Sequence, residues 1–227
     1  SNLGGVVVAA GRSTRMGGGD KTFAPLLGVP LIAHTLDQLE AFPPVAEIVL
    51  VLGAGSLEQG RALVRSRGYR KVVQVCSGGE RRQDSVRNGL EQLSLCDWVM
   101  VHDGARPCLD QAILERGMAA AATCGAAVAG MPVKDTIKLV SEELLVTGTP
   151  DRSRLWAAQT PQVFHYSLLM EAHRDHAQTV TDDASMVEGL GHQVQMFQGS
   201  YENLKVTTAE DLVLAETFLR ARTLVGD

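Results

Sequence analysis

The sequence has little of what marks membrane, nucleic-acid-binding or disulfide-stabilised proteins. No apolar run reaches the roughly 18 residues that cross a membrane, so we expect no membrane partner. A formal net charge of -5 leaves no basic excess, which argues against a general nucleic-acid binder. The four cysteines stand alone without C-x-x-C spacing, so neither a zinc site nor a redox pair is expected. Reduced thiols of this kind indicate a cytoplasmic protein.

What the sequence does contain is typical of a globular chain. Hydrophobic residues make up 45% and charged residues 21% of its 227 residues, which argues against disorder. This length suits one domain, which we place over residues 1–227, with an insertion at about 133–155.

Apolar runs and helical patterns alternate in the first half of the chain. The runs predicted as strands are Gly5–Ala9, Glu47–Leu52, Lys71–Val75, Trp98–His102 and Ala126–Met131. The helical windows between them lie near Leu31–Ala41, Leu57–Arg67, Gln83–Leu93 and Gln111–Thr123. Buried strands separated by helices predict a three-layer, Rossmann-like α/β fold: a mostly parallel sheet with helices on both faces. Ligands bind such sheets beyond the carboxyl ends of the strands.

The alternation stops after Pro132. From Val133 to about Leu155, β-branched alternation and polar turns predict an extended β-arm that protrudes from the sheet. The elements expected after it are helices near Tyr166–Ala177 and Asp183–Leu190, a strand at Gln193–Gln198 and a final helix. Thr207 and Glu210 predict a capping box at the start of that last helix.

The stretch AAGRSTRMGGGDK, from Ala9 to Lys21, follows the first predicted strand and is rich in glycine and basic residues. It is neither a dinucleotide fingerprint nor a P-loop. Ser13 stands where the fingerprint needs a glycine, and Arg15 and Asp20 stand where the P-loop needs glycines. Glycines free backbone N–H groups to converge on phosphate oxygens, while Arg15 and Lys21 add charge. The loop therefore predicts a phosphate site.

Motifs along nearly the whole chain carry a specific resemblance. The segment AAGRSTRMGGGDKTFAPLLGVPLI resembles the signature loop of sugar-phosphate nucleotidyltransferases. The later matching segments are GGERRQDSVRNGL, VHDGARPCL, VKDTIK, DRSRLWAAQTPQVF, TDDAS and NLKVTTAEDL. Together they resemble the 2-C-methyl-D-erythritol 4-phosphate cytidylyltransferase family of the non-mevalonate isoprenoid pathway. One departure is Gly104, where the family more often has alanine, and we expect it to make that turn less rigid.

The resemblance implies transfer of the cytidylyl group from CTP to 2-C-methyl-D-erythritol 4-phosphate, with release of pyrophosphate and with Mg²⁺ as the cation. The residues that it assigns to catalysis are Arg15, Lys21, Arg152 and Lys205. Those that it assigns to CTP are Ala9, Ala10, Gly11, Arg15, Lys21, Gly79, Glu80, Ser85, Asp103 and Gly104. Those that it assigns to the polyol phosphate are Asp103, Arg106, Asp135, Thr136, Arg152, Thr160, Thr181 and Lys205.

Two further expectations concern the metal and the partner subunit. Asp103 is the candidate metal ligand, although Mg²⁺ is expected mainly on the triphosphate. The resemblance also implies a homodimer in which the β-arm reaches across to the partner's site.

Two alternatives stay open. A ribitol 5-phosphate cytidylyltransferase would keep the phosphate-handling residues, but its relatives usually carry a bulkier HDSVRP-like turn where this chain has HDGARP. A catalytically inactive nucleotide-binding module on the same fold would predict loss of Arg15, Lys21 or Lys205, and all three are present.

Overall fold

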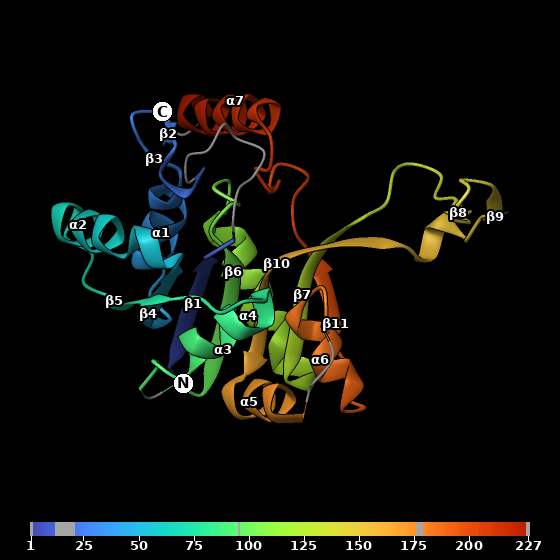
Figure 1. Cartoon of the computed structure of the whole chain (residues 1–227), viewed down its shortest axis with the longest axis horizontal. Helices are drawn as coiled ribbons and strands as arrows, with labels where there is room; N and C mark the ends of the chain where they lie inside the picture. The colour runs from blue at the N-terminus through green and yellow to red at the C-terminus, as the bar shows by residue number, and fades with distance from the viewer. Residues whose placement is uncertain (1, 12–20, 95, 176–178, 226–227) are drawn as a thin grey trace.

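A computed structural model describes residues 2–11, 21–94, 96–175 and 179–225, and a seven-stranded sheet lies at the centre of this part of the chain (Figure 1). The strand order is β11-β7-β10-β6-β1-β4-β5. In chain order these strands are β1 (Leu3–Ala9), β4 (Val45–Leu52), β5 (Val72–Ser77), β6 (Trp98–Asp103), β7 (Ala126–Pro132), β10 (Trp156–His165) and β11 (Gln195–Gln198). Every neighbouring pair is parallel except those that involve β10.

Helices cover both faces of the sheet, as the sequence predicts. One buried cluster packs beneath α1 (Leu31–Ala41), α2 (Leu57–Arg67) and α4 (Gln111–Cys124). The other packs beneath α3 (Arg82–Leu90), α5 (Tyr166–Asp175) and α6 (Asp183–Gly189). The last helix, α7 (Ala209–Val225), covers a smaller third cluster that includes Leu26, Leu31 and Cys108. In the described ranges, no helix combines the length and the apolar character needed to cross a membrane.

Strand β10 is the main feature that the sequence does not reveal. It lies antiparallel between β6 and β7, in the middle of the sheet. Its pairing with β7 shifts between Ala158 and Gln162, and Pro161 lies inside this irregular stretch. A proline inside an apolar run argues against a central strand, because it cannot donate to the ladder. Here the proline is accommodated where the regular pairing is interrupted.

The segment between β7 and β10 contains a small hairpin, β8 (Leu139–Val140) with β9 (Val146–Gly148), which Figure 1 shows far from the sheet. Its apolar side chains are unusually exposed: 78% for Leu144 and 68% for Leu145. The remaining short elements are η1 (Lys21–Phe23), β2 (Pro25–Leu26), β3 (Val29–Pro30), η2 (Ala54–Ser56) and η3 (Arg152–Arg154).

Candidate active site

A cavity of about 820 Å³ opens at the carboxyl ends of β1 and β6. The chain passes from β1 to its neighbour β4 and later returns to the other side of β1 as β6, so the strand order reverses at this point. Crevices at such reversals are where open α/β sheets bind ligands. The lining residues are Val8, Ala9, Ala10, Gly11, Lys21, Thr22, Gly78, Gly79, Glu80, Arg81, Arg82, Ser85, Asp103, Ala105 and Lys205.

Most of the predicted CTP-binding residues line this cavity. They are Ala9, Ala10, Gly11, Lys21, Gly79, Glu80, Ser85 and Asp103. Gly104 lies just behind its wall, where an added Cβ would come within 2.6 Å of Ile32 Cδ1 and 2.9 Å of Ala9 Cβ. Arg15 lies outside the described residues, so its predicted role stays a prediction.

The residues predicted to bind the polyol phosphate divide into three groups. Asp103 and Lys205 line the cavity, and Arg106 contacts Asp103. Four others are exposed and do not line the cavity: Asp135, Thr136, Arg152 and Thr181. Thr160 is buried, with 4% of its surface exposed. Within a single chain, therefore, only part of this predicted set is brought together.

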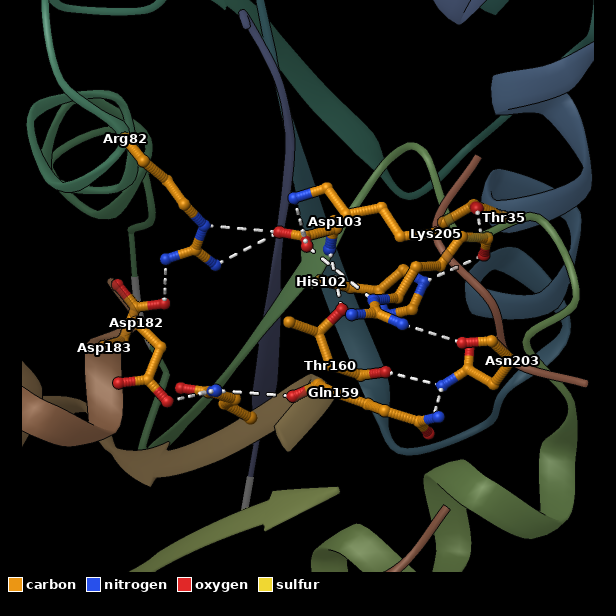
Figure 2. Close-up of polar contacts among 12 residues, drawn as sticks. Thr35, Arg82, His102, Asp103, Gln159, Thr160, Asp182, Asp183, Asn203 and Lys205 are labelled. Carbon is orange, nitrogen blue, oxygen red and sulfur yellow. Dashed lines mark hydrogen bonds and ion pairs between the residues drawn. The ribbon is translucent and has the colours of Figure 1, made fainter. Parts of the chain in front are cut away.

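Asp103, itself buried, is the centre of an ion cluster (Figure 2). Its Oδ2 lies 3.0 Å from Nζ of Lys205 and 3.7 Å from Nε of Arg106. Its Oδ1 lies 3.2 Å from Nη2 of Arg82. Burial by itself would raise the pKa of the Asp103 carboxyl, but the three cations outweigh burial and hold that pKa well below its ordinary value. Asp103 therefore stays ionised at neutral pH.

Arg82, the first residue of α3, joins Asp103 to a second carboxylate (Figure 2). Its Nη1 lies 2.8 Å from Oδ2 of Asp183, which is completely buried at the start of α6. Burial raises the pKa of Asp183, and Arg82 offsets part of that rise. With both carboxylates ionised, three cations face two anions, so the cluster keeps one positive charge in excess. Lys21 lines the same cavity.

Asn203 fixes the segment that carries Lys205. It is completely buried, and its Nδ2 donates to the backbone oxygen of Thr160 at 2.8 Å. Its own backbone oxygen accepts a hydrogen bond from Nη1 of Arg106 at 2.7 Å. Strand β10, the turn after β6 and the segment before α7 are therefore held against one another at the cavity (Figure 2).

The loop before α3 owes its shape to two glycines and a serine. The Gly79 N–H donates to Ser85 Oγ at 3.1 Å, and Ser85 Oγ donates to the Arg81 carbonyl at 3.3 Å. A Cβ on Gly78 would lie 2.3 Å from Ala10 Cβ, so only glycine allows this close approach to the end of β1. Ser85 thus lines the cavity and also bonds the backbone of Gly79 and Arg81.

The described residues do not form a resident magnesium site. Among them, no group of three or more His, Cys, Asp and Glu side chains has the arrangement needed to hold a metal. Both oxygens of Asp103, the candidate ligand, face cations. Mg²⁺ prefers an octahedral set of oxygens, usually including water and substrate phosphates. The donors present do not supply such a set by themselves.

Some residues at the site were not assigned a role from the sequence: Arg82, His102, Asp183 and Asn203. The matching segments GGERRQDSVRNGL and TDDAS contain Arg82 and Asp183, but these two are 101 residues apart and no spacing rule pairs them. For Arg82, the available signal was a charged residue at the start of a predicted helix, beside the edge of the sheet where ligands bind. Only the fold shows which carboxylates Arg82 contacts.

Known proteins resemble this chain over almost its full length. The family model for 2-C-methyl-D-erythritol 4-phosphate cytidylyltransferase matches residues 4–221. A protein of that name from Dehalococcoides mccartyi is 48% identical to this chain, over 96% of this chain and 96% of its own. One from Alkaliphilus oremlandii is 43% identical, over 96% of this chain and 94% of its own.

Solved structures give the same result for the fold. The 2-C-methyl-D-erythritol 4-phosphate cytidylyltransferase of Thermus thermophilus has a TM-score of 0.78 and 32% identity, over 97% of this chain and 100% of that one. The 4-diphosphocytidyl-2C-methyl-D-erythritol synthase of Anaerococcus prevotii has a TM-score of 0.86 and 25% identity, over 96% and 98%. The cavity at the reversal of strand order and the cationic cluster around Asp103 fit these comparisons, and the chain belongs to the 2-C-methyl-D-erythritol 4-phosphate cytidylyltransferase family.

Proposed function

We propose that this protein transfers the cytidylyl group of CTP to 2-C-methyl-D-erythritol 4-phosphate. The products are 4-diphosphocytidyl-2-C-methyl-D-erythritol and pyrophosphate, and the reaction belongs to isoprenoid biosynthesis. The observation that carries this proposal is the cationic cluster around Asp103 at the switch-point cavity, in a chain of this family.

The reaction is an in-line displacement at the α-phosphorus of CTP. A phosphate oxygen of the polyol phosphate forms the new P–O bond, and the bond between the α-phosphorus and the bridging oxygen to the β-phosphate breaks. The second pKa of a phosphate monoester lies near ~6, so the attacking group is mostly dianionic at neutral pH and needs no general base. The main obstacle is repulsion between a dianion and a triphosphate, and positioned cations reduce it.

Lys21 and Arg15 act at the α-phosphate in this proposal, because both belong to the loop that follows β1. Lys205 and Arg106, which both contact Oδ2 of Asp103, bind the phosphate of the polyol. Asp103 accepts hydrogen bonds from hydroxyl groups and keeps Lys205 in place. The backbone of the loop at Gly79, with Glu80 and Ser85, surrounds the cytosine.

In this proposal Mg²⁺ would be held mainly by the triphosphate of CTP, and not by a set of protein carboxylates. It would supply positive charge that offsets the negative charge of the triphosphate. This agrees with a cavity whose described charged side chains are mostly cations rather than a carboxylate cage.

We further propose a homodimer in which the hairpin of β8 and β9 packs on a second copy. The hairpin exposes Leu139, Leu144, Leu145 and Val146, which would lose contact with water in such a dimer. The exposed residues at its base, Asp135, Thr136 and Arg152, would then lie at the partner's cavity. This explains why they do not line a cavity within their own chain.

The test is to incubate the purified protein with CTP, Mg²⁺ and one candidate alcohol phosphate at a time, and to measure pyrophosphate release. We expect release with 2-C-methyl-D-erythritol 4-phosphate and not with ribitol 5-phosphate. Release with ribitol 5-phosphate alone would overturn the substrate, and no release with either would favour the inactive-module alternative.

Lys21→Ala tests the catalytic assignment in the same assay. Loss of one positioned charge is expected to cost on the order of 3 kcal/mol, or about a hundredfold in turnover, with an unchanged circular dichroism spectrum. Arg61→Ala is the control, because Arg61 is an exposed cation on α2 that pairs only with Glu58 among the described residues. Normal turnover of Lys21→Ala would remove Lys21 from the mechanism.

A further inference from the structure

We propose that His102 and Thr160 are positioning residues that lock the Asp103–Arg106 turn from behind, and that neither touches substrate. The two side chains close a hydrogen-bond circuit between the backbone N–H at one end of the turn and the backbone carbonyl at the other. The kinetic consequence rests on the proposed function, whereas the circuit itself can be tested without it.

The circuit has three links, all within the buried side of the site (Figure 2). The backbone N–H of Asp103 donates to Thr160 Oγ1 at 2.9 Å. Thr160 Oγ1 lies 3.0 Å from Nδ1 of His102. Nε2 of His102 lies 3.1 Å from the backbone oxygen of Arg106. His102 has no exposed surface and Thr160 has 4%, so both act out of reach of the cavity.

The backbone partners fix two of the hydrogens. The Asp103 N–H can only donate, so the Thr160 hydroxyl accepts there. The Arg106 carbonyl can only accept, so Nε2 of His102 carries a hydrogen. In the neutral ring Nδ1 is then an unprotonated acceptor, and the Thr160 hydroxyl donates its single hydrogen to it.

The charged groups around His102 agree with this neutral form. Burial is the largest influence, and it lowers the pKa of His102 to about 4. Asp103 favours protonation of the ring, while Arg106 and Arg82 oppose it. At neutral pH the circuit is thus intact.

The circuit matters because the turn it braces presents two residues of the proposed site, Asp103 and Arg106. The sequence predicts a loose turn, because Gly104 lacks a side chain. In the structure both ends of the turn are tied to β10 and β6 through Thr160 and His102. The Thr160 hydroxyl has no hydrogen left for a substrate, so it supports the polyol phosphate through Asp103 and Arg106.

The first test uses nitrogen NMR of ¹⁵N-histidine-labelled wild-type protein, with His102→Gln to assign the signal. We expect the neutral Nε2–H tautomer at pH 7. A protonated Nδ1 would overturn the circuit. This result does not depend on which substrate the enzyme uses.

The second test separates positioning from direct contact. Loss of one buried hydrogen bond corresponds to about tenfold, so Thr160→Val is expected to raise KM for the polyol phosphate by roughly that factor and to leave KM for CTP unchanged. Thr160→Ser keeps the hydroxyl and is expected to restore the wild-type KM. If Thr160→Val only reduced the fraction of correctly folded enzyme, the apparent kcat would fall while both KM values stayed unchanged. That result would overturn the proposal.

A double-mutant cycle completes the test. If the two residues act in one circuit, Thr160→Val combined with His102→Phe raises KM for the polyol phosphate no more than the single change with the larger effect. Additive effects would mean that Thr160 contacts the substrate independently, which would overturn the proposal. His34→Gln is the matched control, because His34 also bonds a backbone carbonyl, that of Leu26 at 2.8 Å, but lies outside the cavity. It is expected to change neither KM.

Discussion

Replacing Arg82 with methionine tests whether the ion cluster is essential for stability. The two carboxylates that Arg82 joins would respond differently. Asp103 would keep Lys205 and Arg106. Asp183 would lose its ion-pair partner while completely buried, and its Oδ1 already lacks a hydrogen bond among the described residues. The main cost of the substitution should therefore fall on Asp183.

The expected magnitude follows from that unpaired carboxylate. Removing one partner of a buried ion pair costs about 3–5 kcal/mol, because the remaining carboxylate must either stay charged without a partner or take up a proton on folding. We expect Arg82→Met to lower the free energy of unfolding at pH 7 by about 4 kcal/mol. Adding Asp183→Asn should recover about half of this, because a neutral amide carries no buried charge and takes up no proton on folding.

The assay is urea unfolding followed by circular dichroism at several pH values. Without Arg82, the folded state should hold a proton on Asp183 that the unfolded state releases. As the pH is lowered below the pKa of Asp183 in the folded variant, the difference in unfolding free energy between wild type and variant should shrink. The decrease should be up to about 1.4 kcal/mol per pH unit. Arg61→Met is the control; its pair with Glu58 is exposed, and it should change stability by less than about 0.5 kcal/mol. A loss for Arg82→Met below about 1 kcal/mol, or one that does not vary with pH, would refute this reasoning.

Three further predictions concern other parts of the molecule. Gly104→Ala should lower the free energy of unfolding by about 1–3 kcal/mol, measured by urea unfolding, because the new methyl group would lie 2.9 Å from Ala9 Cβ; an unchanged midpoint would show that β1 can yield there. The depressed pKa of His102, about 4 in the fold against about 6.5 unfolded, means that the unfolded state gains a proton first as pH falls, so stability is lost from about pH 6.5 downward. Between pH 7 and pH 5 the wild type should therefore lose about 2 kcal/mol more than His102→Gln, and parallel pH profiles would contradict a neutral buried ring. Leu145→Glu on the hairpin should shift the proposed dimer toward monomer in analytical ultracentrifugation without unfolding the chain, whereas an unchanged dimer would place the interface elsewhere.

The N-terminal cap of the last helix lies one residue further along the chain than the sequence predicts. The sequence predicts that Thr207 and Glu210 cap the last helix. In the structure Thr208 and Asp211 do so: the Asp211 N–H donates to Thr208 Oγ1 at 3.3 Å and the Thr208 N–H donates to Asp211 Oδ2 at 2.9 Å. Both pairs have the same spacing and similar chemistry, so local sequence alone does not distinguish them.

The sequence by itself determined the parallel strands, the helices between them and the family. Buried parallel strands need long apolar runs, and phosphate loops need glycine and cations next to such a run, so both leave local patterns. It also indicated Asp103, because a charged residue directly after an apolar strand lies at the ligand edge of the sheet.

Only the tertiary structure decided what surrounds that aspartate. Strand β10 enters the sheet antiparallel beside β6 and brings the Thr160 hydroxyl to His102 across 58 residues of sequence. Arg82 meets Asp183 across 101 residues, so neither pair leaves a periodic trace. The physical reason is that hydrogen bonds and buried charges depend on distances of a few ångströms between side chains, and those distances exist only once the sheet has assembled.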